Sequence, residues 1–384
     1  MKVKLGDVCI IQSGGTPSRS NLDYWKNGTI SWVKISDIKD KYLNFTEEYI
    51  TYEGLKNSSA KIFSKGTILY TIFATLGEVS ILNIEAATNQ AIAGIKLVDE
   101  NVYNDFLYYY LVSKKEEVNN RGRGVAQNNI NLSMLKNIEI EMPNLEKQRK
   151  IANVLDKVNK IINKRQQQLK KIDELVKSRF IEMFGEPDKN TFNWSKEKLG
   201  EHLDVVNGFA FKSEGFTDIG IPVLRIGNIN SGTFKATNMV FWPNDATLFR
   251  YKIYPGDLVI SLTGTVGKDD YGNVCILGTE YKEYYLNQRN AKLDIKNTIN
   301  KYYLSQILKF NEIKNQLTGI SRGVRQANIS IKDILSLSVP IPPIELQDKF
   351  ADFVKQTDKS KLEIQKSLDK LEILKKSLMQ QYFG

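Results

Sequence analysis

The sequence has few of the residues that usually carry chemistry in an active site. Its 384 residues include one histidine, His202, and two cysteines, Cys9 and Cys275, in different halves of the chain. One histidine cannot supply a repeated Ser-His-Asp triad, and two distant cysteines cannot form a zinc cluster or a disulfide framework. We therefore expect no metal site and no cofactor. Both cysteines are expected to be small buried apolar residues, and His202 a hydrogen-bonded surface or boundary residue.

Long apolar runs are also missing. No stretch approaches the roughly 18 apolar residues that a membrane-spanning helix needs. The segment from Met1 to Gly15 lacks the apolar stretch and the cleavage site of a signal peptide. These two absences predict a cytoplasmic protein that makes no contact with a membrane.

Motifs for nucleotides and cofactors are absent or incomplete. Gly264–Lys268 resembles a phosphate-binding loop but lacks its spacing and the Ser or Thr after the lysine, so we interpret it as a turn. No Asn/Asp-Pro-Pro-aromatic tetrapeptide of the amino-methyltransferase kind is present. Asp269 and Asp270 have no acidic counterparts in the other half of the chain. An enzymatic function therefore has little support in the residues.

What the sequence does contain is typical of a globular protein with more than one domain. Hydrophobic residues make up 41% and charged residues 26%, and the length suggests two or three domains. Lys and Arg number 54 against 44 Asp and Glu, a net charge of +10. This excess favours polyanionic partners such as nucleic acid without establishing one.

The chain contains an internal repeat. In its best-matched part the offset is constant, since 323 − 124 = 199 and 384 − 185 = 199. Nearer the start the offset varies: 225 − 34 = 191 for Lys34 and Arg225, and 287 − 89 = 198 for Asn89 and Asn287. The matched segments are Lys4–Asp7 with Lys198–Glu201, Ser13–Gly14 with Asn207–Gly208, Gly124–Ile130 with Gly323–Ile329, Pro143–Gln148 with Pro342–Gln347, and Phe184–Gly185 with Phe383–Gly384. Two copies therefore share one framework, and each is most variable toward its start.

The first hundred or so residues of each copy are typical of short strands separated by turns. In the first copy, β-branched and aromatic residues predict strands at 30–35, 67–72, 79–82 and 91–97. A helix is expected at about 105–118 and its counterpart at about 301–317. Further strands are expected at 138–142 and 337–341. Each copy is therefore rich in short strands, with few helices.

After Pro143 and Pro342 the apolar period changes to that of a helix. Apolar residues recur in steps of four and three, which is a heptad pattern, and neither helix has an internal Gly or Pro. Each helix of about 37 residues would span roughly 55 Å. We expect the two to pair within the chain and to run antiparallel if a two-fold axis relates the copies. The alternative is that each apolar stripe packs on its own domain. The expected seam is Ile151, Leu155, Val158, Ile162, Arg165, Leu169, Ile172, Val176, Arg179 and Met183 in one helix, and Phe350, Val354, Thr357, Lys361, Ile364, Leu368, Leu371, Lys375, Leu378 and Tyr382 in the other.

Neighbouring apolar residues are expected to widen both seams. In the first helix these are Val154, Ile161, Leu175 and Phe180, and in the second Phe353, Leu362 and Leu374 compensate for polar seam positions. The predicted fold class is α+β, with two β-rich domains and an intrachain antiparallel coiled coil in a pseudo-two-fold repeat. The expected boundaries are 1–143 and 197–342 for the domains, 144–185 and 343–384 for the helices, and 186–196 for the linker.

The candidate binding residues are polar and basic side chains in loops. Residues kept in both copies, such as Gln127 with Gln326 and Asn129 with Asn328, should serve the shared framework, so readout is expected where the copies differ. Arg suits guanine edges and phosphate. The candidates are Ser18, Arg19, Trp32, Lys34, Ser36, Lys39, Thr71, Thr75, Arg121 and Arg123 in the first copy, and Lys212, Ser213, Arg225, Asn228, Asn230, Ser261, Thr263, Thr265, Lys268, Arg322 and Arg325 in the second.

These features together resemble the specificity subunits of type I restriction–modification enzymes. The resemblance covers essentially the whole chain. It rests on Lys4–Asp7 followed by Ser13–Ser18, the Gly-Val-x-Gln-x-Asn-Ile segments at 124–130 and 323–329, and the Pro-x-x-Glu-x-Gln segments at 143–148 and 342–347. In one respect the chain departs from the family pattern, because its first domain begins almost at Met1 with no leading conserved segment.

The resemblance implies a function. In that family each variable domain is a target-recognition domain that reads one half of a split sequence in double-stranded DNA. The two helices set the gap between the half-sites and dock two methyltransferase (modification) subunits, which methylate adenine with S-adenosylmethionine. Restriction (motor) subunits join to complete the complex, and the specificity subunit has no activity of its own.

Two other functions remain open at the level of the sequence. The first is a DNA methyltransferase or nuclease that carries its own recognition domains, for which S-adenosylmethionine binding by the chain alone would be decisive. The second is a non-catalytic coiled-coil scaffold whose end domains bind RNA or protein. Salt-dependent, sequence-selective DNA binding in the presence of modification partners would exclude this scaffold.

Overall fold

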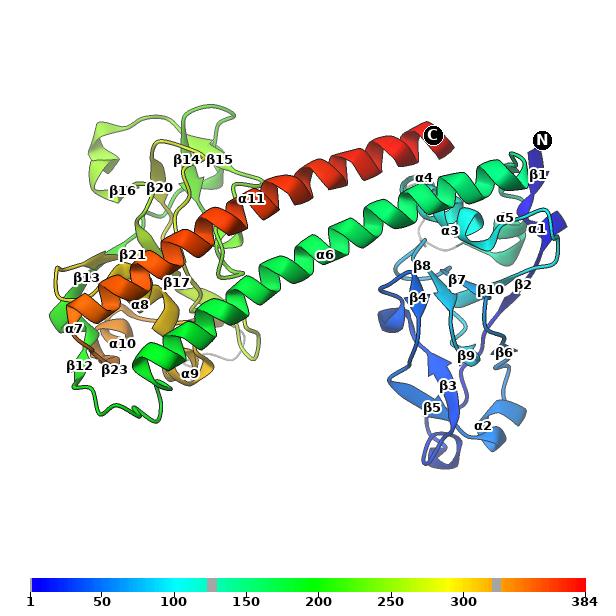
Figure 1. Cartoon of the computed structure of the whole chain (residues 1–384), viewed down its shortest axis with the longest axis horizontal. Coiled ribbons are helices and arrows are strands. Elements are labelled where there is room, and N and C mark those ends of the chain that lie inside the picture. Colours follow the sequence, from blue (N-terminus) through cyan, green and yellow to red (C-terminus); the bar gives the residue numbers. More distant parts are fainter. Residues whose placement is uncertain (1, 123–129, 320–325) are drawn as a thin grey trace. The chain divides into compact units, whose positions relative to one another are not determined.

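The structure is a computed structural model that describes residues 2–122, 130–319 and 326–384. The chain divides into two compact units (Figure 1). Unit 1 consists of Met1–Gln166 and Lys366–Gly384, and unit 2 of Gln167–Gln365. Each unit therefore combines one β-rich domain with parts of both long helices.

Unit 1 is built on two sheets of short strands. A five-stranded sheet has the order β2-β10-β7-β8-β4, and a four-stranded sheet the order β5-β3-β9-β6. A third, two-stranded sheet pairs β1 with β11. The strands are β1 (Lys2–Lys4), β2 (Cys9–Ser13), β3 (Ile30–Val33), β4 (Tyr42–Leu43), β5 (Glu48–Ile50), β6 (Ile62–Phe63), β7 (Ile68–Thr71), β8 (Val79–Leu82), β9 (Ala86–Thr88), β10 (Ile92–Leu97) and β11 (Glu139–Glu141). The strands expected at 30–35, 67–72, 79–82, 91–97 and 138–142 are thereby confirmed.

Unit 2 repeats the main features of this arrangement. Its two four-stranded sheets have the orders β13-β21-β17-β19 and β15-β14-β20-β16, and two further pairs join β12 to β23 and β18 to β22. The strands are β12 (Lys196–Lys198), β13 (Leu203–Asn207), β14 (Ile221–Leu224), β15 (Val240–Trp242), β16 (Lys252–Ile253), β17 (Leu258–Ser261), β18 (Thr263–Thr265), β19 (Val274–Ile276), β20 (Tyr284–Leu286), β21 (Asn290–Ile295), β22 (Gln326–Asn328) and β23 (Ser338–Pro340). The expected strand at 337–341 is β23.

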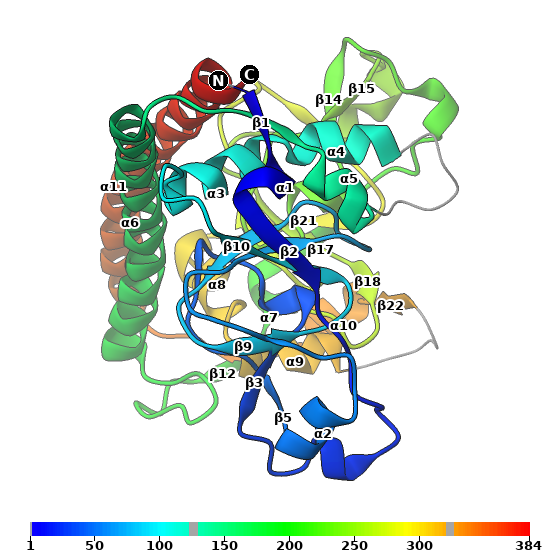
Figure 2. The same ribbon diagram turned by 90° about the vertical axis from the view of Figure 1, so that its right-hand side faces the viewer.

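Short helices complete each domain. In unit 1, α3, α4 and α5 lie near β1 and away from β3 and β5 (Figures 1 and 2). The short helices are α1 (Leu5–Val8), α2 (Tyr52–Lys56), α3 (Asn104–Ser113), α4 (Lys115–Gly122), α5 (Leu132–Lys136), α7 (Leu199–His202), α8 (Lys301–Ile307), α9 (Asn311–Thr318) and α10 (Ile331–Ser336). The helix expected at 105–118 is therefore two helices that meet at Lys114, and the one expected at 301–317 is also two, separated before Asn311.

The two long helices are slightly longer than the sequence suggested. α6 spans Leu145–Phe184 and α11 spans Ile344–Phe383, 40 residues each. In unit 1 the start of α6 and the end of α11 pack on the same core, where the Phe383 and Phe106 rings lie 5.5 Å apart. In unit 2 the end of α6 meets the start of α11, with the Phe180 and Phe350 rings 5.4 Å apart. The helices thus run antiparallel, as expected.

The expected seam positions are confirmed, but most of the apolar residues that were expected to widen the seam are not part of it. All twenty seam positions in α6 and α11 are buried or partly buried. Of the residues expected to widen the seam, Phe180 is buried and Phe353 partly buried. The other five are exposed: Val154, Ile161, Leu175, Leu362 and Leu374. These five apolar side chains are therefore between 37% and 55% exposed to solvent.

Candidate functional site

One parallel strand pair in each domain brings together loops that are far apart in the sequence. In unit 1, β3 pairs with β9 in parallel, with Val33 opposite Thr88. In unit 2, β14 pairs with β20 in parallel, with Leu224 opposite Leu286. Because parallel neighbours end at the same edge of a sheet, the loop after each strand meets the loop after its partner. Both domains therefore build the same two-loop edge.

The first loop is a tight turn closed by its own side chain. The Lys34 amide donates to the Asp37 carboxylate at 3.0 Å, and the Arg225 amide donates to the Asn228 side-chain oxygen at 3.0 Å. The Asn228 amide group also donates to the carbonyls of Lys235 and Thr237, each at 3.0 Å. Asn228 is 3% exposed, so it holds the loop and is withdrawn as a DNA contact.

The second loop is a turn with an asparagine at its start. The Asn89 side-chain oxygen accepts a hydrogen bond from the Ala91 amide at 3.0 Å, and Asn287 accepts from the Arg289 amide at 3.2 Å. The residue after each asparagine, Gln90 or Gln288, is exposed. The asparagine side chain thus holds the backbone of the turn, while the glutamine that follows it is exposed to solvent.

A glycine segment packs against this turn in both domains. A Cβ atom on Gly14 would lie 2.0 Å from the Thr88 hydroxyl oxygen, and one on Gly208 would lie 2.2 Å from the Asn287 carbonyl carbon. No other residue fits at such a distance without moving the backbone. This explains why Ser13–Gly14 is repeated as Asn207–Gly208. It also brings a third loop, which carries Arg19 in unit 1 and Ser213 in unit 2, to the same edge.

In unit 1 the cations at this edge are paired with carboxylates. The Arg19 guanidinium lies 2.6 Å from Glu48 and 3.6 Å from the Trp25 ring centroid, and the Lys34 ammonium lies 2.7 Å from Glu47. The hydrogen bond to Glu47 raises the pKa of Lys34 and lowers that of Glu47. Burial opposes a lowered pKa at Glu48, but the hydrogen bonds from Arg19 and Lys34 outweigh it. The positive charge on this edge of unit 1 is therefore largely neutralised.

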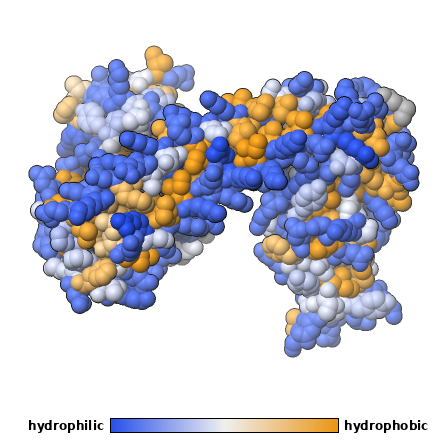
Figure 3. All heavy atoms as spheres, viewed as in Figure 1, coloured by the Kyte–Doolittle hydropathy of each residue, from blue (hydrophilic) through white to orange (hydrophobic). Residues whose placement is uncertain are grey.

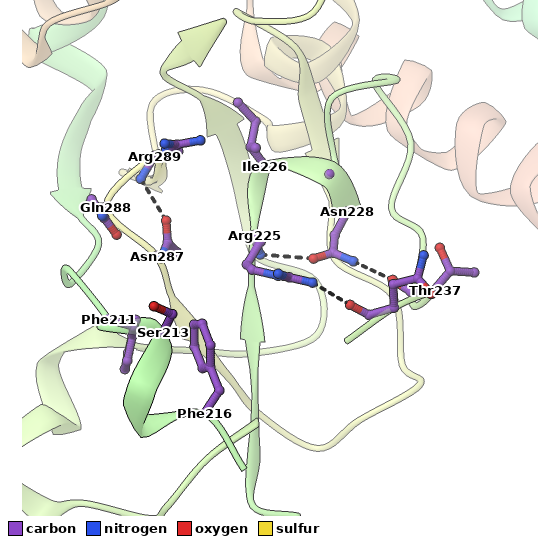
Figure 4. A pocket seen from close by; sticks show the side chains of 12 residues that line it. Phe211, Ser213, Phe216, Arg225, Ile226, Asn228, Thr237, Asn287, Gln288 and Arg289 are labelled. Carbon is purple, nitrogen blue, oxygen red and sulfur yellow. Dashed lines mark hydrogen bonds between the residues drawn. The ribbon is translucent and has the colours of Figure 1, made fainter. Parts of the chain in front are cut away.

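In unit 2 the same edge borders a hollow of about 520 Å³. Among the described residues that line it, none is acidic. Figure 4 shows Arg225 bonded toward the neighbouring loop, where its guanidinium donates to the Asn238 carbonyl at 2.7 Å, and Arg289 on the turn that begins at Asn287. The lining residues are Phe211, Ser213, Phe216, Arg225, Ile226, Gly227, Asn228, Thr237, Asn238, Asn287, Gln288 and Arg289. Amide groups and two arginines make the hollow suited to an anionic, hydrogen-bonding partner.

Three further sequence candidates are buried and are also withdrawn as DNA contacts. Trp32 is 2% exposed, and its indole donates to the Gly15 carbonyl at 3.1 Å, so it supports Arg19 from the core. Thr71 is fully buried and its hydroxyl closes the loop before β8, accepting from the Glu78 amide at 2.9 Å. Ser261, also fully buried, accepts from the Asn273 amide at 3.0 Å.

The remaining candidates differ in where they lie. Thr263 and Thr265 belong to β18, which pairs with β22 and directly follows Leu262, whose amide donates to the Arg289 carbonyl at 2.8 Å. The exposed candidates are Ser18, Arg19, Ser36, Lys39, Thr75, Lys212, Ser213, Asn230, Thr265 and Lys268, whereas Lys34, Arg225 and Thr263 are partly exposed. Arg123, Arg322 and Arg325, together with the side chain of Arg121, lie outside the described residues.

Two residues at the edge in unit 2 were missed by sequence reasoning. Neither Gln288 nor Arg289 is among the candidates that the sequence offered, although both directly follow the repeated asparagine Asn287. The signal that would have found Arg289 is its alignment with Ala91 directly after a shared Asn-Gln pair. A charged residue opposite an alanine beside a repeated turn marks a position where the two copies differ in chemistry.

The residues with possible metal or nucleophilic chemistry have structural roles. His202 is 6% exposed and is hydrogen-bonded to Thr298 at 2.8 Å and to Glu197 at 2.9 Å. Glu197, Glu201 and His202 are the group of described residues whose ligand atoms come within 4.8 Å of one another. Cys9 and Cys275 are buried free thiols, as expected, and burial raises the pKa of each to about 12. No helix within the described ranges combines the length and apolarity needed to cross a bilayer.

Comparison with known proteins gives one consistent result. The family model described as "Type I restriction modification DNA specificity domain" matches residues 1–171 and 192–374. The chain is 26% identical to the specificity subunit of the Methanocaldococcus jannaschii type I restriction enzyme MjaIX, over 98% of this chain and 90% of that protein. It is also 26% identical to the MjaVIII specificity subunit of the same organism, over 74% of this chain and 71% of that protein.

Solved structures agree on the fold. The crystal structure of the S subunit of a type I restriction–modification system from M. genitalium matches with a TM-score of 0.58 at 18% identity, and the match covers 100% of this chain and 96% of that one. A structure from work on complex assembly and conformational transition of the type I R-M system matches with a TM-score of 0.55 at 18% identity, covering 100% and 97%.

Proposed function

The chain belongs to the type I restriction modification DNA specificity family, and from that premise we propose that it reads a split target in double-stranded DNA, one part with each domain. The observation that carries this proposal is the repeated edge. The same loops meet in both domains, while the side chains that they expose differ. A shared framework with different exposed chemistry is what two readers of two different sequences require.

The proposed role is recognition without catalysis. The curated relatives are named as specificity subunits, and this chain shares their family model along nearly its whole length. The reaction would then be carried out by modification subunits, two in each complex, with restriction subunits added for cleavage. Such a complex acts on DNA inside the cell, so we place the chain in the cytoplasm.

We assign the docking of modification subunits to the exposed apolar side of the long helices. In unit 1, α6 exposes Val154 and Ile161, one heptad apart, and α11 exposes Ile373 and Leu374. In Figure 3, hydrophobic atoms also gather along the visible side of α11. Apolar groups at heptad spacing favour contact with another helix.

The docking assignment can be tested by changing this side of α6 alone. The double variant Val154→Glu, Ile161→Glu should keep the thermal unfolding midpoint of the chain but no longer copurify with its modification subunit. Lys157→Glu, at an exposed position between the two, is the matched control and should copurify normally. Normal assembly by the double variant would contradict the assignment.

The proposed function itself is tested by mapping methylated bases. We expect host DNA to carry a split methylated-adenine motif when this gene and its modification gene are present, and to lose it when this gene alone is deleted. A motif that survives the deletion would contradict the proposal. Binding of S-adenosylmethionine by the isolated chain would instead favour an enzyme that carries its own recognition domains.

A further inference from the structure

The second loop at the edge of unit 2 carries a cation that the corresponding loop of unit 1 lacks. The turn after β20 runs Asn287-Gln288-Arg289, and the corresponding turn after β9 runs Asn89-Gln90-Ala91. Gln288 and Arg289 are both exposed. Among the residues that the structure describes, none accepts a hydrogen bond or an ion pair from the Arg289 guanidinium. Within the described ranges, the Arg289 guanidinium is therefore free to bind a partner.

Three hydrogen bonds fix the backbone of the turn that carries Arg289. The Asn287 side chain accepts from the Arg289 amide, the Gln288 amide donates to the Phe209 carbonyl at 2.9 Å, and the Asn290 amide donates to the Asn287 carbonyl at 2.9 Å. The buried Asn290 side chain donates to the Leu224 carbonyl at the end of β14. A fixed backbone sets the point and direction from which the Arg289 side chain leaves the turn, and selective contact with a base needs such a fixed origin.

The surroundings of Arg289 also favour a base over a backbone phosphate. Arg225, the other arginine of the hollow, is already bonded to the Asn238 carbonyl and lies deeper, with a buried Nε atom. The groups next to Arg289 are the amides of Gln288 and Asn287. Arginine pairs with the O6 and N7 atoms of guanine, and glutamine pairs with the N6 and N7 atoms of adenine. The turn thus presents adjacent side chains that match purine edges in the major groove.

We propose that Arg289 is a specificity-determining residue that reads one guanine in the half-site bound by unit 2, while the turn at Gln90 and Ala91 reads no guanine in the other half-site. This inference rests on the proposed function. The proposed function requires a split DNA target, and the inference adds that one position of this target is a guanine. In unit 1 the nearest cations, Arg19 and Lys34, are occupied by Glu48 and Glu47, so that edge offers no equivalent free arginine.

The test uses the complete complex of this chain with its modification subunits. Methylation rates are measured on duplexes in which each base pair of the two half-sites is replaced in turn. For the wild-type chain, replacing one G·C pair in the second half-site should lower the rate by roughly 5- to 150-fold, the discrimination expected of one bidentate contact. Arg289→Ala should abolish discrimination at that position only, and Arg289→Gln should shift its preference from guanine toward adenine.

A matched control separates base reading from loss of charge. Arg250→Ala removes an exposed arginine of the same unit, stacked 4.6 Å from the Tyr251 ring and outside the hollow, and should leave every preference unchanged. If Arg289→Ala lowers methylation of all duplexes equally, or changes the first half-site, the inference is overturned and the proposed function stands. If the wild-type complex methylates no split motif, the proposed function fails and the inference fails with it.

Discussion

At the start of each long helix, one buried glutamine binds the helix to the domain that precedes it. Gln148 accepts from the Tyr103 amide at 2.8 Å and donates to the Asn101 and Pro143 carbonyls at 2.9 Å. Gln347 accepts from the Asn300 amide at 2.8 Å and donates to the Pro342 carbonyl at 2.7 Å. These bonds explain why the repeated segments at 143–148 and 342–347 end in glutamine.

The contribution of this glutamine can be measured in unit 2. Gln347→Ala leaves the Asn300 amide and the Pro342 carbonyl without their partner, which should lower the free energy of unfolding by about 1–3 kcal/mol. Urea unfolding followed by circular dichroism gives the value. Gln356→Ala, at an exposed position on the same helix, should change it by less than about 0.5 kcal/mol. Equal losses of unfolding free energy for the two substitutions would contradict a stabilising contribution from the buried hydrogen bonds.

The two cysteines should be inert in the folded chain. Burial raises the pKa of Cys9 and Cys275 to about 12, so almost no thiolate exists at pH 8, and reagents cannot reach the sulfur atoms. Iodoacetamide at pH 8 should therefore label neither cysteine in native protein and both in urea. The account of their burial would be wrong if the native protein were labelled as fast as the unfolded protein.

Predictions for single residues fail where the direction of the side chain decides whether the residue is buried or exposed. The sequence identified Arg19, Lys34 and Arg225, which do lie at the shared edge. It also chose Trp32 and Asn228, because the two copies differ at these positions. Their burial depends on which way a side chain points from a strand end or a turn, and spacing alone does not determine that direction in a loop.

At the scale of elements, the apolar period was sufficient to predict the long helices and their seam. It was insufficient to predict which residues beside the seam are buried. The heptad pattern identified all twenty seam positions of α6 and α11. It did not show that Ile161 and Leu175 are exposed, because an apolar residue beside a seam is buried only if a neighbour covers that side. Short elements such as β9, Ala86–Thr88, were missed because three residues carry no detectable period.

The junction of α6 with α11 in unit 2 should be a main source of that unit's stability. Phe350 is fully buried and its ring lies 5.4 Å from Phe180 and 5.6 Å from Phe184. Phe350→Ala should cost about 3–5 kcal/mol of unfolding free energy, through lost burial and the cavity left behind. Leu362→Ala, on the same helix but 55% exposed, serves as the control and should cost little. Calorimetric or urea unfolding that showed similar losses for both would contradict this packing.

At the scale of the whole molecule, the repeat predicted more than composition did. A net charge of +10 favoured nucleic acid only in general terms, whereas the constant offset of 199 residues predicted two domains and two equivalent helices. The repeat also explains why Phe184–Gly185 matches Phe383–Gly384. Each helix ends in the unit that contains the start of the other helix, so each terminal phenylalanine joins that unit's core. The parallel strand pairs that build the shared edge were not predictable, because the pairing joins segments more than 50 residues apart.

The central claim is that two domains of one chain read two parts of one target independently. The most direct measurement replaces residues 1–140 with the corresponding domain of another specificity subunit and maps methylated adenines in cells that express the hybrid complex. The account predicts a new sequence in one half of the motif and an unchanged sequence in the half read by unit 2. A change in both halves, or in neither, would contradict it.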